Sequence, residues 1–363
     1  MSIPLLYTPS AADVDELEAV TVGRTDLLDI LTRRITASAR DGSRPHTLVV
    51  AGAGAGKTHT MRVALHRACA DAATAKSVLP VVVSEEALAI GSYVDLLVEA
   101  ARVVSPQLAE TAKALRLARD PIGIEAAILA AAGDRMVLLV IENLDRVFDA
   151  LGATGQGSLR AWVETSTAIM LFGTAPTLFP GVSSREYPWY GSFIVERLPD
   201  LAVDDVAALL RRAAQRRGDA TLMAFLDSEA GRDRVAALHR RVGGTPRSWH
   251  LVAEHLDAAQ LDAVTPAVHA LLDRLAPYYR PRLWQLPAGE QRLIVELGRG
   301  PGRRSVSELA AAVGVSNQSA SAALGRLAAE GWVTSSKSDG DRRTSWYDLT
   351  DPLLRGYLQY RDA

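Results

Sequence analysis

The chain lacks several features that would place it in a specialised class of protein. It has one cysteine, Cys69, among 363 residues, so no disulfide can form within the chain. Its 40 Lys and Arg residues nearly balance its 42 Asp and Glu residues, and the formal charge is only −2. A basic field that would attract any polyanion is therefore absent, and a contact with nucleic acid would have to be local.

Long apolar runs are also missing. The longest, 126–132 and 136–141, are separated by Gly133, Asp134 and Arg135 and fall far short of the ~20 residues that span a bilayer. Residues 1–20 include acidic side chains where a secretory signal has a basic flank and an apolar run. We therefore expect no membrane segment and a cytoplasmic protein.

Lysine is scarce as well. Only four of the 40 basic residues are lysines, so a lysine in a recognisable motif is less easily attributed to chance than usual. The lysines are Lys57, Lys76, Lys113 and Lys337.

The length of the chain predicts two or three domains, at roughly 100–200 residues per domain.

Residues 1–200 alternate short apolar runs with helical patterns, which is the order typical of a doubly wound parallel α/β sheet. Nearly every position in these runs is apolar, as in strands that helices cover on both faces. We therefore expect a buried central sheet. The runs are 46–52, 78–84, 137–141 and 169–174, with a weaker one at 193–195.

The pattern changes twice after this region. From 202 to 276 helical patterns follow one another without strands, which predicts an all-helical domain. The stretch 277–287 has three prolines, two tyrosines and a tryptophan, and we expect it to be an ordered connector. Three further helical segments and two β-like runs around Ser338-Asp339-Gly340 then predict a small domain with a hairpin. The expected domains are 1–200, 201–282 and 283–363.

The strongest motif follows the first apolar run. Residues 51–58 read Ala-Gly-Ala-Gly-Ala-Gly-Lys-Thr and precede a helical pattern, and these are the parts of a Walker A loop. In such a loop the backbone N–H groups bind phosphates, the ammonium of Lys57 bridges β- and γ-oxygens, and the hydroxyl of Thr58 binds Mg²⁺. Ala51 replaces the usual first glycine. The predicted nucleotide contacts are Gly52, Ala53, Gly54, Ala55, Gly56, Lys57, Thr58 and His59.

A carboxylate that helps to hold Mg²⁺ is expected at the end of a neighbouring strand. The run 137–141 ends in Glu142-Asn143-Leu144-Asp145, which resembles a Walker B box with two changes. Glu142 replaces the magnesium-directed Asp, a role that glutamate can fill. Asn143 replaces the water-activating Glu, and asparagine cannot act as a base. We therefore expect slow ATP hydrolysis, unless Asp145 or Glu142 activates the water.

Together the two boxes resemble the AAA+ and STAND groups of P-loop ATPases, and further residues favour AAA+ ATPases of the replication-initiator type. The resemblance covers roughly residues 20–275. It implies an adenine contact, a polar sensor of the γ-phosphate, an arginine finger acting on a neighbouring subunit, and an arginine that reaches the nucleotide from a helical lid. The residues at these positions are Val22, Gly23 and Arg24 for adenine, Thr174 for the sensor, Arg185 for the finger, and Arg247 for the lid.

Residues 305–332 have the spacing of a helix-turn-helix, with Gly314 at the turn and Ser316 as the N-cap of the second helix. We expect Ala320, Leu324 and Leu327, together with Val315, to face inward on that helix. With the hairpin as a wing, the region resembles the winged-helix domain of MarR-type regulators and of the initiator ATPases. Gln can read adenine, and Ser and Asn can bind bases or phosphates. The predicted DNA contacts are Asn317, Gln318, Ser319 and Ser321, Arg326 near the backbone, and Lys337, Arg342 and Arg343 on the wing.

The charge of this region argues against strong DNA binding by the winged helix alone. Residues 283–363 contain ten Lys and Arg against nine Asp and Glu, a balance of +1. DNA-binding domains usually have a stronger basic footprint. DNA binding would therefore need several subunits or help from the ATPase, and a winged helix that contacts protein is the alternative.

These inferences lead to one main hypothesis. We expect the chain to bind ATP or ADP with Mg²⁺, to hydrolyse ATP weakly, to self-associate through Arg185 and the ATPase core, and to couple its nucleotide state to binding of double-stranded DNA. One alternative is a MarR-like transcriptional regulator gated by ATP. The other is a STAND-type signalling or defence ATPase whose winged helix contacts protein rather than DNA.

Overall fold

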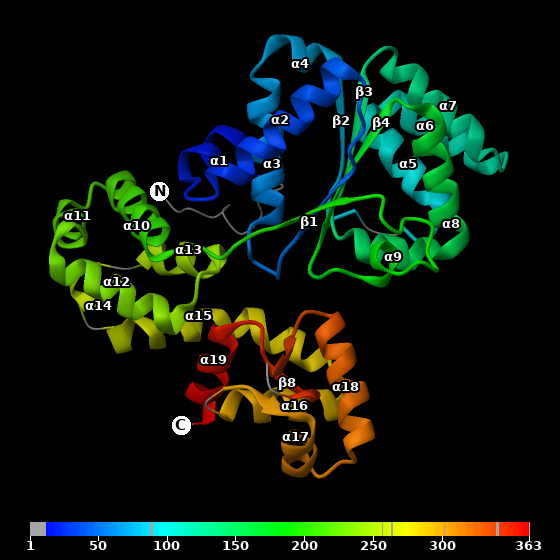
Figure 1. Ribbon diagram of the computed structural model, residues 1–363. Helices are drawn as coiled ribbons and strands as arrows, with labels where there is room; N and C mark the ends of the chain where they lie inside the picture. Colours follow the sequence, from blue (N-terminus) through cyan, green and yellow to red (C-terminus); the bar gives the residue numbers. More distant parts are fainter. Residues whose placement is uncertain are drawn as a thin grey trace.

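A five-stranded parallel sheet is the framework of the N-terminal part of the computed structural model, which describes residues 12–87, 90–255, 257–262, 264–300, 302–338 and 341–362 (Figure 1). The strand order is β2-β3-β4-β1-β5. Each pair of neighbours is parallel, which confirms the predicted doubly wound α/β fold. The strands are β1 (Thr47–Val50), β2 (Val78–Val83), β3 (Met136–Ile141), β4 (Ile169–Ala175) and β5 (Ile194–Arg197).

Helices cover both faces of this sheet. Every residue of β3 and β4 is buried, which explains why their sequences are apolar at consecutive positions. The edge strand β5 differs, because its Ile194 and Val195 are exposed. One side carries α1 (Val14–Val20), α2 (Thr25–Asp41), α3 (Lys57–Cys69) and α4 (Ala72–Ser77), and the other α5 (Tyr93–Val104), α6 (Pro106–Leu117), α7 (Pro121–Ala132), α8 (Leu144–Ser166) and α9 (Pro180–Ser183).

The next part of the chain is entirely helical, as expected. Its last helix, α15, continues to Gln285 with Pro277 and Pro281 inside it, so the predicted connector is ordered but helical. Proline normally ends a helix. Here Tyr279 and Leu283 are buried in the core, and their packing outweighs that tendency. The helices are α10 (Val203–Arg217), α11 (Ala220–Asp227), α12 (Glu229–Val242), α13 (Pro246–His255), α14 (Ala258–Asp262) and α15 (Val264–Gln285).

The C-terminal part has the predicted winged-helix arrangement. Ser305 and Ser316 cap its second and third helices, and Gly314 makes the turn between them with φ of 75°. Val315 precedes the third helix and is only half-buried, whereas the other expected inward residues are buried on it. The elements are α16 (Ala288–Arg299), β6 (Arg304–Ser305), α17 (Val306–Val313), α18 (Asn317–Ala329), β7 (Val333–Ser338), β8 (Asp341–Leu349) and α19 (Pro352–Asp362).

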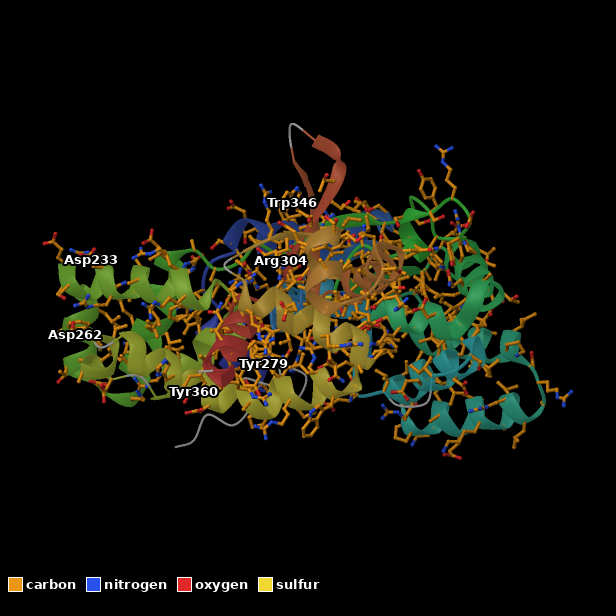
Figure 2. The ribbon with its side chains drawn as sticks, turned by 90° about the horizontal axis from the view of Figure 1, so that it is seen from below. Asp233, Asp262, Tyr279, Arg304, Trp346 and Tyr360 are labelled. Atoms are coloured by element: carbon orange, nitrogen blue, oxygen red, sulfur yellow. The ribbon has the colours of Figure 1, made fainter. Side chains whose placement is uncertain are left out.

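One continuous hydrophobic core joins the helical part to the winged helix. Tyr279 of α15 donates a hydrogen bond of 2.5 Å to Asp351, at the start of α19, and Tyr360 near the end of α19 bonds to Asp273 of α15 (Figure 2). Asp351 is buried, and burial raises its pKa although the hydrogen bond from Tyr279 opposes this shift. The two parts therefore pack as one body. Within the described residues, every helix is too short or too polar to cross a bilayer.

Tyr357 of α19 allows a test of this shared core. Its ring lies 5.2 Å from that of Tyr279, and the residue is 1% exposed. Tyr357→Ala is expected to lower the free energy of unfolding by about 3–5 kcal/mol, because it leaves a cavity. The Tyr357 hydroxyl is buried without a hydrogen-bond partner among the described residues, so Tyr357→Phe should cost no stability. Denaturant unfolding measures both, and equal losses for the two variants would contradict this packing.

Candidate functional site

The candidate site lies where four strands of the sheet end. Val50 of β1 pairs with Ala175 of β4, and Ile141 of β3 pairs with Gly173 of β4 and Val83 of β2. Because parallel strands run in one direction, the residues that follow them meet at the same edge of the sheet. A cavity of about 320 Å³ opens there, and the helical part and the winged helix lie on the same side of the sheet (Figure 1).

The glycine-rich loop follows β1 and curls around the start of α3. Gly54 and Gly56 have φ values of 80° and 86°, a region that glycine enters without strain. The loop is also held from the helical part, because the Arg247 backbone N–H donates to the Gly54 carbonyl at 3.2 Å. The N-terminus of α3, a helix of 13 residues, therefore faces the cavity with its unpaired N–H groups, which is the geometry of an anion site.

Lys57, the first residue of α3, lines the cavity. Its ammonium donates to the loop carbonyls of Ala51 at 2.8 Å and Gly52 at 3.2 Å. Burial lowers the pKa of Lys57 to about 8, although the carboxylates of Glu85 and Asp145 oppose this shift. Two carbonyls of the loop therefore hold the Lys57 ammonium at the cavity.

Thr58 and Glu142 both line the cavity and contact one another. The Thr58 hydroxyl donates to the Glu142 carboxylate, which also accepts the backbone N–H of Glu85 at 2.9 Å. Glu142 is 6% exposed, and burial raises its pKa despite these hydrogen bonds. The two groups that the sequence assigns to a magnesium ion are thus adjacent.

Asn143 and Asp145 occupy the turn from β3 into α8. Asn143 has φ of 50°, and its backbone N–H donates to the Thr174 hydroxyl oxygen at 3.1 Å. Its side-chain amide points to Glu85, with 3.4 Å between Nδ2 and Oε2. Asp145 is held by backbone N–H groups at the start of α8, and its Oδ1 is buried with no hydrogen-bond partner among the described residues. Burial raises the pKa of Asp145.

The other end of the cavity is lined by the segment before α2 and by two histidines. The Thr21 hydroxyl lies 2.7 Å from His59 Nε2. Burial lowers the pKa values of His59 and His250 to about 4, so both rings are neutral at pH 7. Arg24 crosses from this segment to the loop, where it donates to the Ala55 carbonyl at 2.6 Å, and burial lowers its pKa to about 10.

A row of stacked side chains leads from the cavity to the winged helix. The Arg247 guanidinium lies 5.0 Å from the centre of the Tyr278 ring, on α15. Arg282, one turn further along α15, lies 4.9 Å from the same ring and 4.7 Å from the ring of Trp332. Arg247, Tyr278 and Arg282 all line the cavity. We call Arg247, Tyr278, Arg282 and Trp332 the stack.

The winged helix also contacts the sheet domain directly. The Thr177 hydroxyl, just after β4, donates to the Ala329 carbonyl at the end of α18, at 3.2 Å. Glu330 and Gly331, the next residues, line the cavity. In Figure 1 the C-terminal end of α18 accordingly points at the sheet domain. The cavity therefore has three walls, from the sheet domain, the helical part and the winged helix.

Most of the predicted nucleotide and catalytic residues line this cavity, and two do not. Ala55 is buried behind the loop, and Arg185 is exposed beyond α9, with its guanidinium 5.7 Å from the Tyr190 ring. Their predicted roles, like those of the lining residues, stay predictions. The lining residues among them are Val22, Gly23, Arg24, Gly52, Ala53, Gly54, Gly56, Lys57, Thr58, His59, Glu142, Asn143, Asp145, Thr174 and Arg247.

Several residues of the cavity are not among those that the sequence predicts. Glu85 could have been found, because it follows the apolar run 78–84 and the ends of parallel strands share one edge. Others come from the helical and winged-helix parts, where no motif marks them. They include His250, Tyr278, Arg282, Glu330 and Gly331.

The predicted DNA-contacting residues of α18 are exposed at its N-terminal end. They are Asn317, Gln318, Ser319 and Ser321, although Ser319 also accepts a hydrogen bond from the cap residue Ser316. Arg326 forms an ion pair of 2.7 Å with the buried Glu290, so the protein already holds its guanidinium. Lys337, Arg342 and Arg343 belong to β7 and β8, but their side chains lie outside the described part of the structure, as do Asp339 and Gly340.

The comparison with known families identifies the C-terminal part. Residues 284–344 match a model of the MarR family, which covers the winged helix from just before α16 into β8. No curated protein matches the chain. The MarR-like winged helix of the sequence analysis is thereby confirmed.

Solved structures are similar to the chain over most of its length. The ORC1 protein of Aeropyrum pernix, solved in complex with DNA, has 15% identity and a TM-score of 0.49, with 95% of this chain and 94% of that chain covered. The Aeropyrum pernix ORC2 protein has 12% identity and a TM-score of 0.44, with 93% and 94% covered. A Thermotoga maritima RuvB mutant has 16% identity and a TM-score of 0.45, with 91% and 92% covered. Likenesses this distant say nothing about residue roles.

The loop glycines offer a test of the local geometry. A Cβ on Gly54 would lie 3.1 Å from the Arg247 Cβ at a positive φ, whereas a Cβ on Gly52 would meet only the Thr350 methyl group, at 3.9 Å. Gly54→Ala should therefore lower the free energy of unfolding by about 1–2 kcal/mol without any ligand, and Gly52→Ala should change it little. Thermal unfolding of the two variants measures the difference. A Gly52→Ala loss as large as that of Gly54→Ala would contradict this loop conformation.

Proposed function

We propose that the protein is a nucleotide switch, in which ATP and Mg²⁺ bind the cavity and alter how the winged helix sits on the sheet domain, and with it the affinity for double-stranded DNA. The observation that carries this proposal is the composition of the cavity. Its walls include Lys57 of the loop, Arg247 of the helical part, and Gly331 of the winged helix. A ligand there would touch all three parts at once.

The phosphate end of the cavity suits a nucleoside triphosphate. The N–H groups of the loop and of α3 would bind the phosphates, and the Lys57 ammonium would exchange the carbonyls of Ala51 and Gly52 for phosphate oxygens. Mg²⁺ would be held by Thr58 and Glu142, which already form a hydrogen bond, and would neutralise phosphate charge. No group of three or more His, Cys, Asp or Glu residues in the described chain could hold a metal alone, so phosphate oxygens would complete the site.

The opposite end of the cavity would take the base. Val22, Leu28 and Leu209 line it with apolar surface. His59 and His250 are neutral there, because burial lowers their pKa values, and neutral imidazoles can stack on a base or hydrogen-bond to it. This assigns the segment 22–24 to the base side of the cavity, as the AAA+ resemblance implies for adenine.

The stack would transmit the nucleotide state. A γ-phosphate attracts the Arg247 guanidinium, and ADP lacks that phosphate, so only ATP would draw Arg247 away from the Tyr278 ring. Tyr278 also supports Arg282, which supports Trp332 at the start of the wing. Loss of one contact would therefore change how the winged helix rests on the sheet domain.

DNA would be read by the exposed N-terminal end of α18. Asn317, Gln318 and Ser321 are available there, and the wing would add Lys337, Arg342 and Arg343. Because Arg326 is held by Glu290, the positive charge offered to DNA is small. With about three to five phosphate contacts, the slope of log K against log salt would be only about −3 to −4.5.

Self-association through the ATPase core belongs to the same proposal. Arg185 is exposed on the surface of the sheet domain, away from the cavity of its own chain. That position suits a guanidinium that acts on a neighbouring copy. We also propose the domain limits 1–200, 201–282 and 283–363, of which the last two share a core.

One contact favours a second candidate function. The hydrogen bond from Thr177 to Ala329, together with Glu330 and Gly331 in the cavity wall, makes the winged helix an internal clamp on the nucleotide, as in a STAND-type signalling ATPase. In that case its exposed end would contact protein. Retained ATP binding with no DNA binding at low salt would favour this candidate.

The first prediction concerns nucleotide binding. Lys57→Ala should weaken binding of ATP by about 10- to 100-fold, because charge-assisted hydrogen bonds to phosphate are lost. Lys76→Ala, on the exposed surface of α4, is the control and should bind like the unmutated protein. Isothermal titration with ATP and Mg²⁺ measures both. Unchanged affinity in Lys57→Ala would refute nucleotide binding at this loop.

The second prediction concerns coupling. DNA affinity of the unmutated protein should differ by about 5-fold or more between a non-hydrolysable ATP analogue and ADP. Arg247→Ala and Tyr278→Ala should remove this difference while the analogue still binds. Tyr278→Phe keeps the ring but removes the hydroxyl that accepts a hydrogen bond from Arg282, and it should retain the difference if the ring carries the coupling. Fluorescence anisotropy of labelled DNA at low salt measures the affinities.

Three possible results would contradict the proposed nucleotide switch. Equal DNA affinity with the analogue, with ADP and without nucleotide in the unmutated protein would exclude it. A full nucleotide response in Arg247→Ala would exclude Arg247 as the sensor. Loss of the response in Tyr278→Phe would assign the connection to the hydrogen bond between Arg282 and the Tyr278 hydroxyl and would exclude ring stacking alone.

A further inference from the structure

Hydrolysis of ATP in this cavity would need a group that accepts a proton from the attacking water, and this requirement rests on the proposed function. Asn143 stands next to the proposed magnesium ligand Glu142, but its amide cannot accept a proton. Three carboxylates of the sheet domain line the cavity, Glu85, Glu142 and Asp145, and a fourth, Glu330, lines it from the winged helix. Their surroundings distinguish them.

Glu142 and Asp145 are both less exposed than Glu85. Glu142 accepts hydrogen bonds from the Thr58 hydroxyl and from the Glu85 backbone N–H, and in the proposed function it holds the metal ion. Asp145 accepts hydrogen bonds from backbone N–H groups at the start of α8, and its Oδ1 is buried. Glu142 is buried and Asp145 is half-buried, so both are less accessible to a water in the open cavity than an exposed carboxylate is.

Glu85 is placed differently. It follows β2 by two residues, on the strand next to β3, so it reaches the carboxyl edge beside Glu142. Its backbone N–H anchors it to Glu142, while its side chain is exposed to solvent. Like Lys57, Glu85 lines the cavity. The carboxylate thus lies in the same cavity as the group that would contact the γ-phosphate.

Asn143 completes the arrangement. Its Nδ2 lies 3.4 Å from Glu85 Oε2, so the amide donates toward one carboxylate oxygen and leaves the other accessible. The positive φ of Asn143 and the bond from its backbone N–H to Thr174 fix the residue from which this amide extends. An acid on β2 and an amide on β3 therefore form a pair at the mouth of the cavity.

We propose that Glu85 is the general base of ATP hydrolysis in this protein and that Asn143 positions its carboxylate. The water oxygen forms a bond to the γ-phosphorus, and the bond between that phosphorus and the β–γ bridging oxygen breaks. The bridging oxygen leaves as part of ADP, and a proton of the water passes to Glu85 and then to solvent. The products are ADP, inorganic phosphate and a proton.

Single-turnover hydrolysis of ATP by the full-length protein, with Mg²⁺, tests the proposal. Glu85→Gln keeps the shape of the side chain and should lower the rate about 100-fold or more, with ATP affinity changed by less than about 3-fold. Glu86→Gln is the control, since Glu86 is the neighbouring glutamate outside the cavity lining, and it should hydrolyse at the unmutated rate. Asn143→Glu added to Glu85→Gln returns a carboxylate to the pair and should restore part of the rate.

The outcomes separate this inference from the function on which it rests. A Glu85→Gln variant that hydrolyses ATP at the unmutated rate overturns the inference, and so does a large loss confined to Asp145→Asn. If Glu85→Gln loses ATP binding in titration, Glu85 shapes the site instead of acting on water, which also overturns it. Failure of the unmutated protein to bind ATP refutes the proposed function itself, whereas binding without hydrolysis refutes only the role of Glu85.

Discussion

The parallel register of the sheet is the constraint on which the site depends. Strands β1, β2, β3 and β4 run the same way, and their last residues pair across the sheet at one edge. The segments that follow β1, β2 and β3 bring an ammonium, an exposed carboxylate, and a carboxylate with an amide to that edge, and β4 itself brings the Thr174 hydroxyl. A change of register by one residue would separate them, so the buried strands position the site, although Thr174 is the only strand residue among the described residues of its lining.

A second constraint is the continuity of α15. The helix passes through Pro277 and Pro281 without ending and carries Tyr278 and Arg282 on the cavity side and Tyr279 in the core with α19. One rigid element therefore holds cavity residues and the packing of the winged helix together. Under the proposed switch, a shift of Tyr278 cannot be absorbed by a flexible linker, because α15 leads into the core that both parts share.

The sequence predicts the features that depend only on residues close together along the chain. The buried strands, the glycine loop before α3, and the caps Ser305 and Ser316 follow from local composition and spacing, and each is present. Features that depend on tertiary packing could not be found in this way. The position of Glu85 at the end of a predicted strand is visible in the sequence, but chain order does not reveal that β2 lies beside β3, and so does not show that Glu85 lies next to Glu142. Helix α15 was expected to end early, because the burial of Tyr279 and Leu283 is not visible in the proline-rich sequence.

The contacts of α18 determine which surface of the winged helix stays exposed, and therefore how a nucleotide could regulate it. Its C-terminal end touches the sheet domain through Ala329, while Asn317 and Gln318 at the other end of the helix are exposed. In Figure 2 the hairpin of β7 and β8 also projects away from the rest of the molecule, with Trp346 at its base. Docking of the winged helix therefore does not cover the predicted base-reading surface. A nucleotide that altered this docking would change the orientation of the surface, and hence whether neighbouring copies can engage DNA together. With nearly balanced charge, one winged helix would have little affinity for DNA of its own, so under the proposed function its orientation within an assembly would have a large effect on binding.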